Sequence, residues 1–334
     1  MKKILLSLAL LCLGFYAMAQ DATKVLFIGN SYTEVNNLPQ LVKSVAESAR
    51  FDVSVMANTP GGCTFRQHCT NQSMDLIRQG GWDFVVLQEQ SQYPAFPQNQ
   101  VDNEVFPYAW ELAKAVKNVG ARPMFYMTWG RKDGDQQNGQ IFPPIATYEG
   151  MDSLLYERYM YMATTNEASV CPVGRVWRYI RENHHSIELY QADGSHPSMA
   201  GSYAAACAFF VMIFHQPTDL ITYDAGLDSA TAQIIRNVVN DIVYDHYDLW
   251  YDPANYDPNE GGDDPLAISD ADAALSRIYP NPATSQAAIE GHFEILDAMG
   301  RILISGTDRA DLSSLPQGVY IVRRPGATER LIKQ

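Results

Sequence analysis

The chain has 334 residues and a formal net charge of −14 at pH 7, and loss of the two lysines near its start would make the charge −16. A strongly acidic protein repels phosphate backbones, so we expect no nucleic acid partner. Solubility alone is the simpler reason for such a charge. The length suffices for one large domain and a small additional module.

Residues 1–19 have the features of a secretory signal peptide. Two lysines precede an apolar run over residues 4–16, which is too short to span a bilayer comfortably, and residues 17–19 form a small-x-small cleavage site. We therefore expect export to the periplasm and a mature chain that begins at Gln20. No other long apolar run follows, so we expect no integral membrane span in the mature chain.

Strand-like and helix-like patterns alternate over residues 20–251. The predicted strands cover residues 24–28, 51–57, 83–88, 122–128 and 169–173. The predicted helices cover residues 38–49, 98–119, 145–164, 176–181, 198–215 and 227–247, and Pro107 is a candidate break in the second of them. Such alternation favours a doubly wound α/β sandwich with a parallel sheet, whose sites lie at the carboxyl ends of the strands.

The composition changes after Tyr251. Residues 252–277 are acidic and lack apolar periodicity, which indicates a linker. Residues 278–334 carry short alternating runs bounded by turn residues, which predict a small all-β sandwich module. We therefore expect four parts: a signal peptide (1–19), a large domain (20–251), a linker (252–277) and a β module (278–334).

Four cysteines remain after residue 19. Cys63 and Cys69 close a short loop, which makes them the plausible disulfide pair of a secreted protein. Cys207 lies in an apolar helical pattern and is expected to be a buried thiol. Cysteines and histidines show no metal-ligand spacing, so we expect no metal site.

Two separate stretches carry candidate catalytic side chains. The first predicted strand runs into a tight turn that places the Ser31 hydroxyl at the strand's carboxyl end, and Asp193 and His196 lie three positions apart in a later loop. A serine nucleophile needs a base within hydrogen-bond reach, and that base needs an orienting partner. In this reading Ser31 attacks, His196 carries the proton and Asp193 orients the imidazole.

Each stretch also has a structural reading. Ser31 can cap the helix that follows it, and Asp193 with Gly194 can form an ordinary turn. Taken singly, each structural reading is the more common one. The occurrence of both stretches within one α/β pattern is what favours the catalytic reading.

The same stretches resemble the conserved blocks of the SGNH/GDSL hydrolases. Residues 29–33 are similar to the first block, with Asn30 where the commoner pattern has Asp, and residues 193–197 are similar to the last block. The resemblance implies a flavodoxin-like three-layer α/β/α sandwich and ester hydrolysis through an acyl-enzyme. The implied triad is Ser31, Asp193 and His196, and no cofactor is implied.

The resemblance also implies an oxyanion hole. Its donors would be the Ser31 N–H, the N–H of Gly62 (with Gly61 as the alternative) and the side-chain amide of Gln88. Gln88 stands after the third predicted strand, where the family usually has an Asn, so this part of the site departs from the common pattern. The residues expected to line the substrate site are Asn30, Glu89 and Trp129.

The C-terminal residues have a resemblance of their own. Residues 278–283, 296–301 and 315–322, together with Lys333 near the end, resemble the sorting domain of type IX secretion substrates. The resemblance implies that type IX secretion machinery is a partner. It also implies a final location at the cell surface or in the extracellular space.

The leading hypothesis is a secreted serine esterase that acts on an acylated glycan, as a carbohydrate O-acetyl or O-acyl esterase. The preference for a glycan rests on the family resemblance and on export. A lipase, phospholipase or thioesterase of the same superfamily is an alternative. A catalytically impaired surface glycan-binding protein is another, and the residues at positions 30 and 88 leave room for it.

Overall fold

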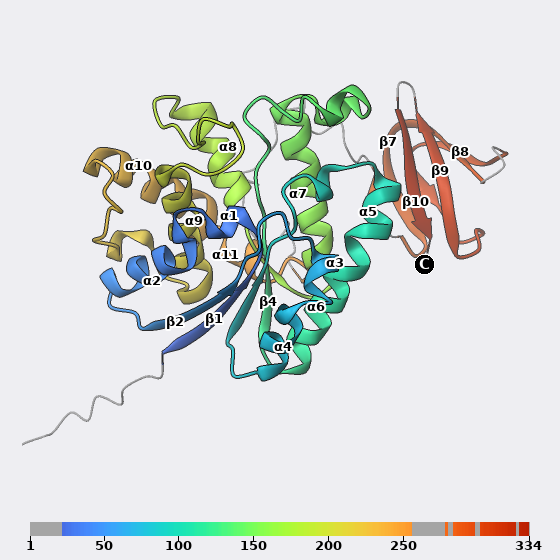
Figure 1. The fold of residues 1–334 in the computed structure, drawn as a ribbon. Coiled ribbons are helices and arrows are strands. Elements are labelled where there is room, and N and C mark those ends of the chain that lie inside the picture. Colours follow the sequence, from blue (N-terminus) through green and yellow to red (C-terminus); the bar gives the residue numbers. More distant parts are fainter. Residues whose placement is uncertain (1–21, 256–277, 280–282, 298–300, 325–326, 334) are drawn as a thin grey trace, which may run out of the picture. The chain divides into compact units, whose positions relative to one another are not determined.

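A computed structural model describes residues 22–255, 278–279, 283–297, 301–324 and 327–333. The chain divides into two compact units, Met1–Asp257 and Pro258–Gln334, which are coloured from blue to orange and from orange to red in Figure 1. The predicted signal peptide (1–19) and residues 256–277 of the predicted linker lie outside the described residues. The predicted domain boundaries therefore stay predictions.

A five-stranded parallel sheet forms the centre of the larger unit. Its strands are β1 (Thr23–Ile28), β2 (Val53–Asn58), β3 (Phe84–Leu87), β4 (Arg122–Tyr126) and β5 (Ser169–Cys171). They lie in the order β2-β1-β3-β4-β5, and every pairing is parallel. This is the order of flavodoxin-like doubly wound folds, and it confirms the predicted fold class.

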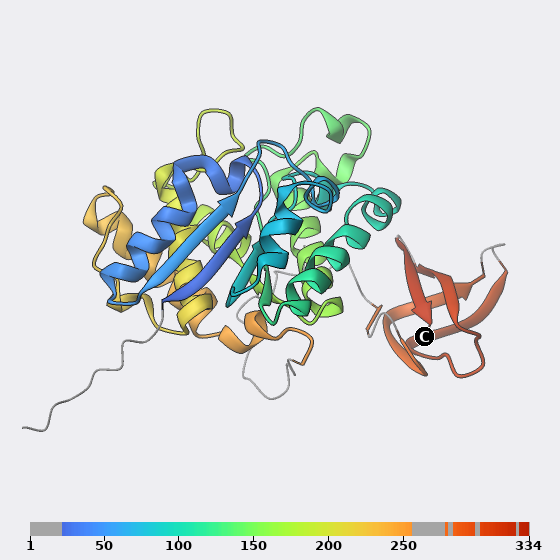
Figure 2. The ribbon, with the colours of Figure 1, turned by 60° about the horizontal axis from the view of Figure 1, so that its bottom comes forward.

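Helices cover both faces of this sheet (Figures 1 and 2). One layer contains α2 (Leu38–Ser48), α8 (Val173–Asn183), α9 (Met199–Phe214) and α10 (Ser229–Val239). The other contains α3 (Phe65–His68), α4 (Gln72–Gln79), α5 (Gln98–Glu104), α6 (Phe106–Asn118) and α7 (Tyr148–Thr165). The short helices α1 (Ser31–Glu34) and α11 (Tyr247–Tyr251) complete the unit. None of the helices in the described part of the chain is long and apolar enough to cross a membrane.

One sequence prediction is sharpened and one is wrong. The helix predicted over residues 98–119, with Pro107 as a candidate break, is two helices, α5 and α6, because Pro107 lacks an N–H and starts a new helix in its first turn. Cys63 and Cys69 are both free thiols. Cys63 Sγ lies 3.7 Å from His68 Nδ1, whereas Cys69 Sγ donates to the Tyr108 carbonyl at 3.8 Å. The thiols meet different partners, so the pairing prediction is wrong.

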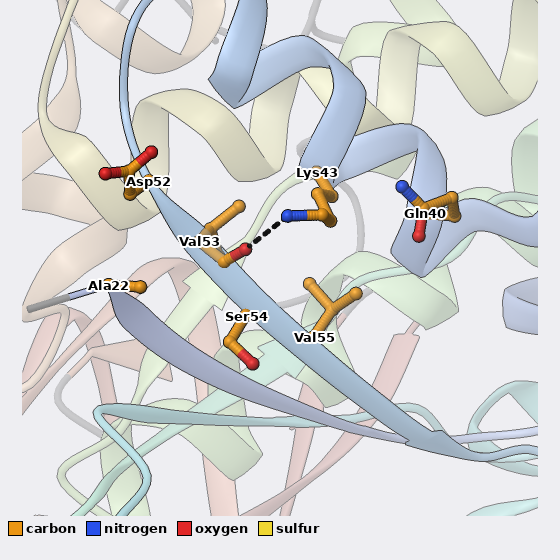
Figure 3. A pocket seen from close by; sticks show the side chains of 7 residues that line it. All are labelled: Ala22, Gln40, Lys43, Asp52, Val53, Ser54 and Val55. Carbon is orange, nitrogen blue, oxygen red and sulfur yellow. Dashed lines mark hydrogen bonds between the residues drawn. The ribbon is translucent and has the colours of Figure 1, made fainter.

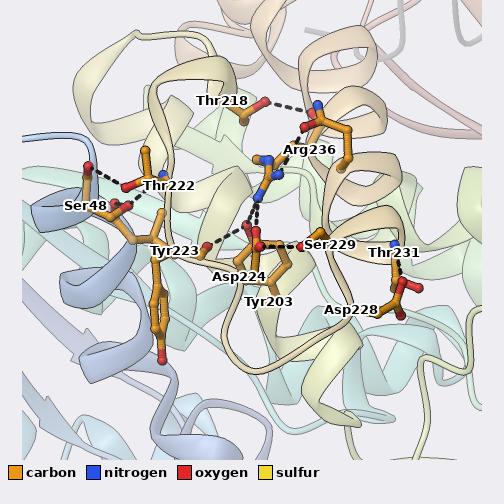
Figure 4. A network of polar contacts seen from close by, with 12 residues as sticks. Ser48, Tyr203, Thr218, Thr222, Tyr223, Asp224, Asp228, Ser229, Thr231 and Arg236 are labelled. Atoms are coloured by element: carbon orange, nitrogen blue, oxygen red, sulfur yellow. Dashed lines mark hydrogen bonds and ion pairs between the residues drawn. The ribbon is translucent and has the colours of Figure 1, made fainter.

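A polar network fixes the connection between α9 and α10 (Figure 4). The Arg236 guanidinium donates to the Tyr203 hydroxyl at 2.8 Å and to a carboxylate oxygen of Asp224. Thr222 bonds to Ser48 at the end of α2 through its backbone N–H and its hydroxyl, both at 3.2 Å. The network therefore anchors α9, the helix that begins just after the predicted His196 loop.

The smaller unit is an antiparallel β module. Its strands are β6 (Ile278–Tyr279), β7 (Gln286–Leu296), β8 (Ile302–Asp311), β9 (Gly318–Arg324) and β10 (Ala327–Lys333). They pair in the order β10-β9-β7-β6, with β8 against β7. Alternate residues of β7, among them Ala287, Ile289, Phe293 and Ile295, point into a buried core. The all-β class predicted for this region is confirmed.

Candidate active site

The sheet brings two polar turns together at its carboxyl edge. Ile28 at the end of β1 pairs with Leu87 at the end of β3. The turn that carries Ser31 follows β1, and Gln88 follows β3. The chain leaves β1 toward β2 on one side and returns to β3 on the other, so the strand order reverses at β1. Ligands of open α/β sheets bind in the crevice at such a point.

Ser31, His196 and Asp193 form a continuous chain of hydrogen bonds. Ser31 Oγ lies 2.9 Å from His196 Nε2, and His196 Nδ1 lies 2.5 Å from Asp193 Oδ2. The other Asp193 oxygen accepts the backbone N–H groups of Ser195 and His196, both at 3.0 Å. The three side chains therefore have the arrangement that a nucleophile, a base and an orienting carboxylate require.

Asp193 is held in its charged form. Desolvation alone would raise the pKa of its carboxyl, but the hydrogen bonds from the His196 side chain and from two backbone N–H groups outweigh it, and the pKa lies below its ordinary value. Ser31 is half-buried, and the side chains of His196 and Asp193 are 31% and 48% exposed. The arrangement can therefore be reached from solvent.

The turn around Ser31 is fixed by Gln88. Gln88 Oε1 accepts from the Asn30 N–H at 3.0 Å and from the Thr33 hydroxyl at 2.9 Å. A Cβ on Gly29 would lie 2.5 Å from Thr33 Oγ1 and 2.7 Å from Gln88 Oε1, so only glycine fits there. Asn30, not Ser31, caps helix α1, because its side chain accepts the Tyr32 N–H. The Ser31 hydroxyl is thereby left for His196.

The assignment of Gln88 to the oxyanion hole needs correction. Its amide nitrogen donates to Asn30 Oδ1 at 2.9 Å and to the Glu89 carbonyl, so both amide hydrogens are used. The residue is 0% exposed. Gln88 therefore positions the turn and has no donor left for a substrate. The two departures from the common family pattern, at positions 30 and 88, contact each other.

Two backbone N–H groups remain as candidate oxyanion donors. Ser31 is the first residue of α1, where backbone N–H groups have no partner within the helix. Gly62 is exposed, with φ of +69°, and precedes Cys63, whose carbonyl accepts from Asn30 Nδ2 at 3.0 Å. The loop that carries Gly62 therefore lies against the turn that carries Asn30 and Ser31. The oxyanion roles of Ser31 and Gly62 remain proposals.

The three side chains expected to line the substrate site are buried. Asn30 is 2% exposed, and Glu89 and Trp129 are 0% exposed. The Glu89 carboxylate accepts the backbone N–H groups of Phe65 and Gln90, and burial raises its pKa to about 8. These residues brace the loops behind the site, so the lining predictions are wrong.

An aromatic stack holds the loop of His196. The ring of Tyr32 stacks on Trp129 at 4.8 Å between centroids, and Trp129 stacks on Trp177 at 3.7 Å. The Tyr32 hydroxyl lies 2.7 Å from Ser195 Oγ, and Trp129 Nε1 donates to the Ser195 carbonyl at 3.1 Å. The imidazole of His196 packs edge-on against Tyr32 at 5.5 Å. Sequence reasoning missed this role, although Tyr32 directly follows the nucleophile.

His68 is a second residue that sequence reasoning missed. Its Nε2 lies 2.9 Å from the Gly29 carbonyl, and its Nδ1 lies 2.7 Å from Ser73 Oγ. The side chain is 0% exposed, and burial lowers its pKa to about 4. A neutral imidazole therefore donates to the carbonyl directly before the nucleophile turn. No signal near His68 in the sequence indicates this partner.

Two cavities differ in their relation to the site. One of 370 Å³ opens beside the first half of β2, between Lys43, Asp52 and Val53 among others (Figure 3). Neither Ser31, Asp193 nor His196 lines it. Another of 350 Å³ borders the loop that carries Asp193. It is lined by Lys132, Asp133, Glu188, Tyr190, Gln191, Ala192, Asp193 and Gly194. The second cavity is therefore the one that belongs to the surroundings of the triad.

Comparison with known families decides the nature of the smaller unit. Residues 277–334 match the family model described as the secretion system C-terminal sorting domain. The C-terminal unit is a secretion sorting domain. This sorting domain implies export to the cell surface or outside the cell by secretion machinery. The sorting resemblance stated from the sequence is thereby confirmed.

The larger unit is similar to several solved structures. A DUF4886 family protein from Bacteroides uniformis has 16% identity and a TM-score of 0.56, over 72% of this chain and 100% of that one. A proposed SGNH hydrolase from Slackia heliotrinireducens has 28% identity and a TM-score of 0.48, over 57% and 98% of the two chains. An acetyl xylan esterase has 12% identity and a TM-score of 0.46, over 57% and 100%.

These similarities bear on the resemblance stated from the sequence. The Bacteroides uniformis structure shows that the fold of the larger unit is shared. None of the curated proteins compared with the chain matches it.

Proposed function

We propose that the protein is a secreted serine esterase whose larger unit hydrolyses an O-acyl ester, most favourably the acetyl or acyl ester of a glycan. The observation that supports this proposal most strongly is the hydrogen-bonded chain from Ser31 through His196 to Asp193. Three such groups in that order activate a hydroxyl, and they recur on unrelated folds for this chemistry.

The steps follow from the positions of the three side chains. His196 Nε2 takes the hydroxyl proton as Ser31 Oγ attacks the ester carbonyl, and Asp193 stabilises the imidazolium. Backbone N–H groups of Ser31 and Gly62 receive the oxyanion. The protonated His196 then gives its proton to the leaving alcohol, which leaves an acyl-Ser31. Water, deprotonated by His196, then attacks the acyl carbon; the bond to Ser31 Oγ breaks, His196 returns its proton to that oxygen, and the acid is released.

A polar substrate fits the solvent-facing residues beside Ser31 better than a long acyl chain does. Most of the exposed or half-buried residues in the segments next to the turn are polar or small, among them Glu34, Thr59, Pro60, Gly61, Gly62, Gln90 and Gln92. A lipid chain needs an apolar surface of considerable area, and no side chain among these supplies one. The binding-protein alternative loses its main support, because Asn30 and Gln88 keep the turn intact by bonding to each other.

The test uses the full chain with 4-nitrophenyl acetate and acetylated glycans. Wild type is expected to release acetate, and Ser31→Ala to lose activity by about 10³-fold or more, with unchanged melting temperature. An equally active Ser31→Ala would remove the nucleophile assignment. A rate that rises steadily with acyl length would replace the glycan ester with a lipid ester.

A further inference from the structure

The segment Trp129–Asp135 contacts three other segments of the candidate site. Trp129 stacks on Tyr32 of the nucleophile turn. The backbone N–H of Lys132 donates to the Gly194 carbonyl at 2.8 Å, next to Asp193. Gln92, from the loop after β3, donates to a carboxylate oxygen of Asp135. Arg131 belongs to this segment, and its guanidinium pairs with Asp135, the carboxylate that Gln92 also contacts.

The guanidinium of Arg131 is only partly satisfied. Its Nη1 lies 3.6 Å from Asp135 Oδ1, which is an ion pair but longer than a hydrogen bond. Its Nε is buried and has no partner among the described residues. A guanidinium has five N–H donors, and buried donors are normally paired. Since the side chain is 29% exposed, part of the group can still meet a ligand from solvent.

Asp135 orients Arg131 without saturating it. Its carboxylate is 0% exposed and also accepts from the backbone N–H of Asn138 at 3.1 Å, from the Asn138 amide at 2.8 Å and from Gln92. Hydrogen bonds lower the pKa of Asp135 against its burial, so it is charged. The anion is therefore shared among several donors, and the cation beside it is held in place with donors to spare.

The neighbouring cations are committed elsewhere. Lys132 Nζ pairs with Glu188 at 2.5 Å. The Arg181 guanidinium donates to the Lys132 carbonyl at 3.0 Å and lies 3.8 Å from the ring centre of Tyr148. Of these three cations, Arg131 is therefore the one whose contacts among the described residues leave N–H donors free for an added anion. A fork of donors that is already oriented suits a carboxylate.

We propose that Arg131 recognises a carboxylate on the alcohol part of the substrate, so that the enzyme prefers esters of an acidic sugar, such as an O-acetylated uronic acid residue. This inference rests on the proposed esterase function. In a chain of net charge −14, an acidic glycan is repelled at long range, so a local cation is needed to select it.

The experiment compares two ester substrates with one acyl group: O-acetylated oligogalacturonate and neutral O-acetylated xylo-oligosaccharide. Arg131→Gln should lower kcat/KM for the acidic substrate about 10- to 100-fold and change the neutral one less than about twofold. Lys132→Gln is the matched control, with the same charge removed one position away, and should change both about equally. An equal loss on both substrates in Arg131→Gln, or an equal preference in wild type, overturns the proposal.

A measurement on wild type alone guards against a variant that fails to fold. Free galacturonate should inhibit hydrolysis of 4-nitrophenyl acetate by the wild type, whereas galactose at equal concentration should not; equal inhibition by the two sugars overturns the proposal. The 4-nitrophenyl hemisuccinate ester places the carboxylate on the acyl side instead. A preference for hemisuccinate over acetate that depends on Arg131 overturns the alcohol-side assignment. Activity on 4-nitrophenyl acetate that does not depend on Ser31 removes the nucleophile assignment instead, and a wild type inactive on every ester refutes the esterase function.

Discussion

The nucleophile turn and the acid–base loop of the triad are built in opposite ways. The turn is buried: Asn30, Gln88 and His68 around Ser31 are each 2% exposed or less. The loop is open, since the side chain of Asp193 is 48% exposed. Buried side chains saturate the polar groups of the turn, whereas backbone N–H groups and the hydroxyl of Tyr32 hold the loop.

This difference predicts whether a substitution changes the stability of the fold or the catalytic rate. A buried polar group that loses its partner costs folding free energy, because water cannot replace that partner. An exposed group that loses its partner bonds to water instead, so the fold is little affected. We therefore expect changes in the turn to lower stability and changes in the loop to lower the catalytic rate at nearly constant stability.

The largest expected effect is that of Asp193→Asn. An amide cannot hold the tautomer in which His196 Nε2 accepts the Ser31 proton, so kcat should fall about 10³- to 10⁴-fold. The unfolding free energy should change by no more than about 1 kcal/mol, because the side chain is half exposed. Steady-state kinetics and thermal unfolding of the same sample measure both. A loss of stability that matches the loss of rate would erase the contrast between the two regions.

Gln88→Leu makes the opposite change in the turn. It leaves the Asn30 N–H and the Thr33 hydroxyl without their partner in a buried place, and Asn30 Oδ1 keeps only the Tyr32 N–H. Each costs about 1 to 3 kcal/mol, so we expect a loss of roughly 4 kcal/mol in urea unfolding. Gln90→Leu, on the same loop but half-buried, is the control and should cost less than about 1 kcal/mol. Equal losses in the two variants would contradict a special role for Gln88.

The sequence predicted the parts that are local. The approximate positions of the five strands followed from short apolar or alternating runs, and Ser31, Asp193 and His196 stand in short motifs next to element ends. Gln88 could not be placed from the sequence, because an amide after β3 can face either a substrate or the turn. Only the pairing of Ile28 with Leu87, and the burial that results, decide between the two.

The same reason explains the other misses. Trp129 follows a strand, as a substrate-lining residue would, yet its neighbours Tyr32 and Trp177 come from distant parts of the chain. His68 bonds to Gly29, 39 positions away. A sequence pattern reports which residues share a face of one helix or strand, but contacts between elements depend on the assembled packing.

Acid should weaken the turn through His68. Its pKa is lowered from 6.5 to about 4 in the folded protein, so between those values the unfolded chain binds a proton that the folded chain does not. The contribution of the neutral His68 side chain to the free energy of unfolding is fully present above pH 6.5 and is lost as the pH falls toward 4. It amounts to up to about 3 kcal/mol.

Urea unfolding from pH 7 to pH 4 measures this effect. The wild type should lose more stability over that range than His68→Gln, whose amide can still donate to the Gly29 carbonyl. His185→Gln removes an exposed imidazole and should keep the wild-type slope. Parallel pH curves for wild type and His68→Gln would show that the neutral imidazole of the turn contributes nothing.

The smallest expected effect tests the link between the two regions. The Tyr32 hydroxyl and Ser195 Oγ are 2.7 Å apart and join the nucleophile turn directly to the acid–base loop. Tyr32→Phe and Ser195→Ala should each lower kcat about 3- to 10-fold with little change in KM, because each releases the loop that holds His196. The double variant should be no slower than either single one, since both remove the same contact. If the fold-losses of kcat in the single variants multiply in the double variant, the two residues act separately, and the aromatic stack alone positions His196.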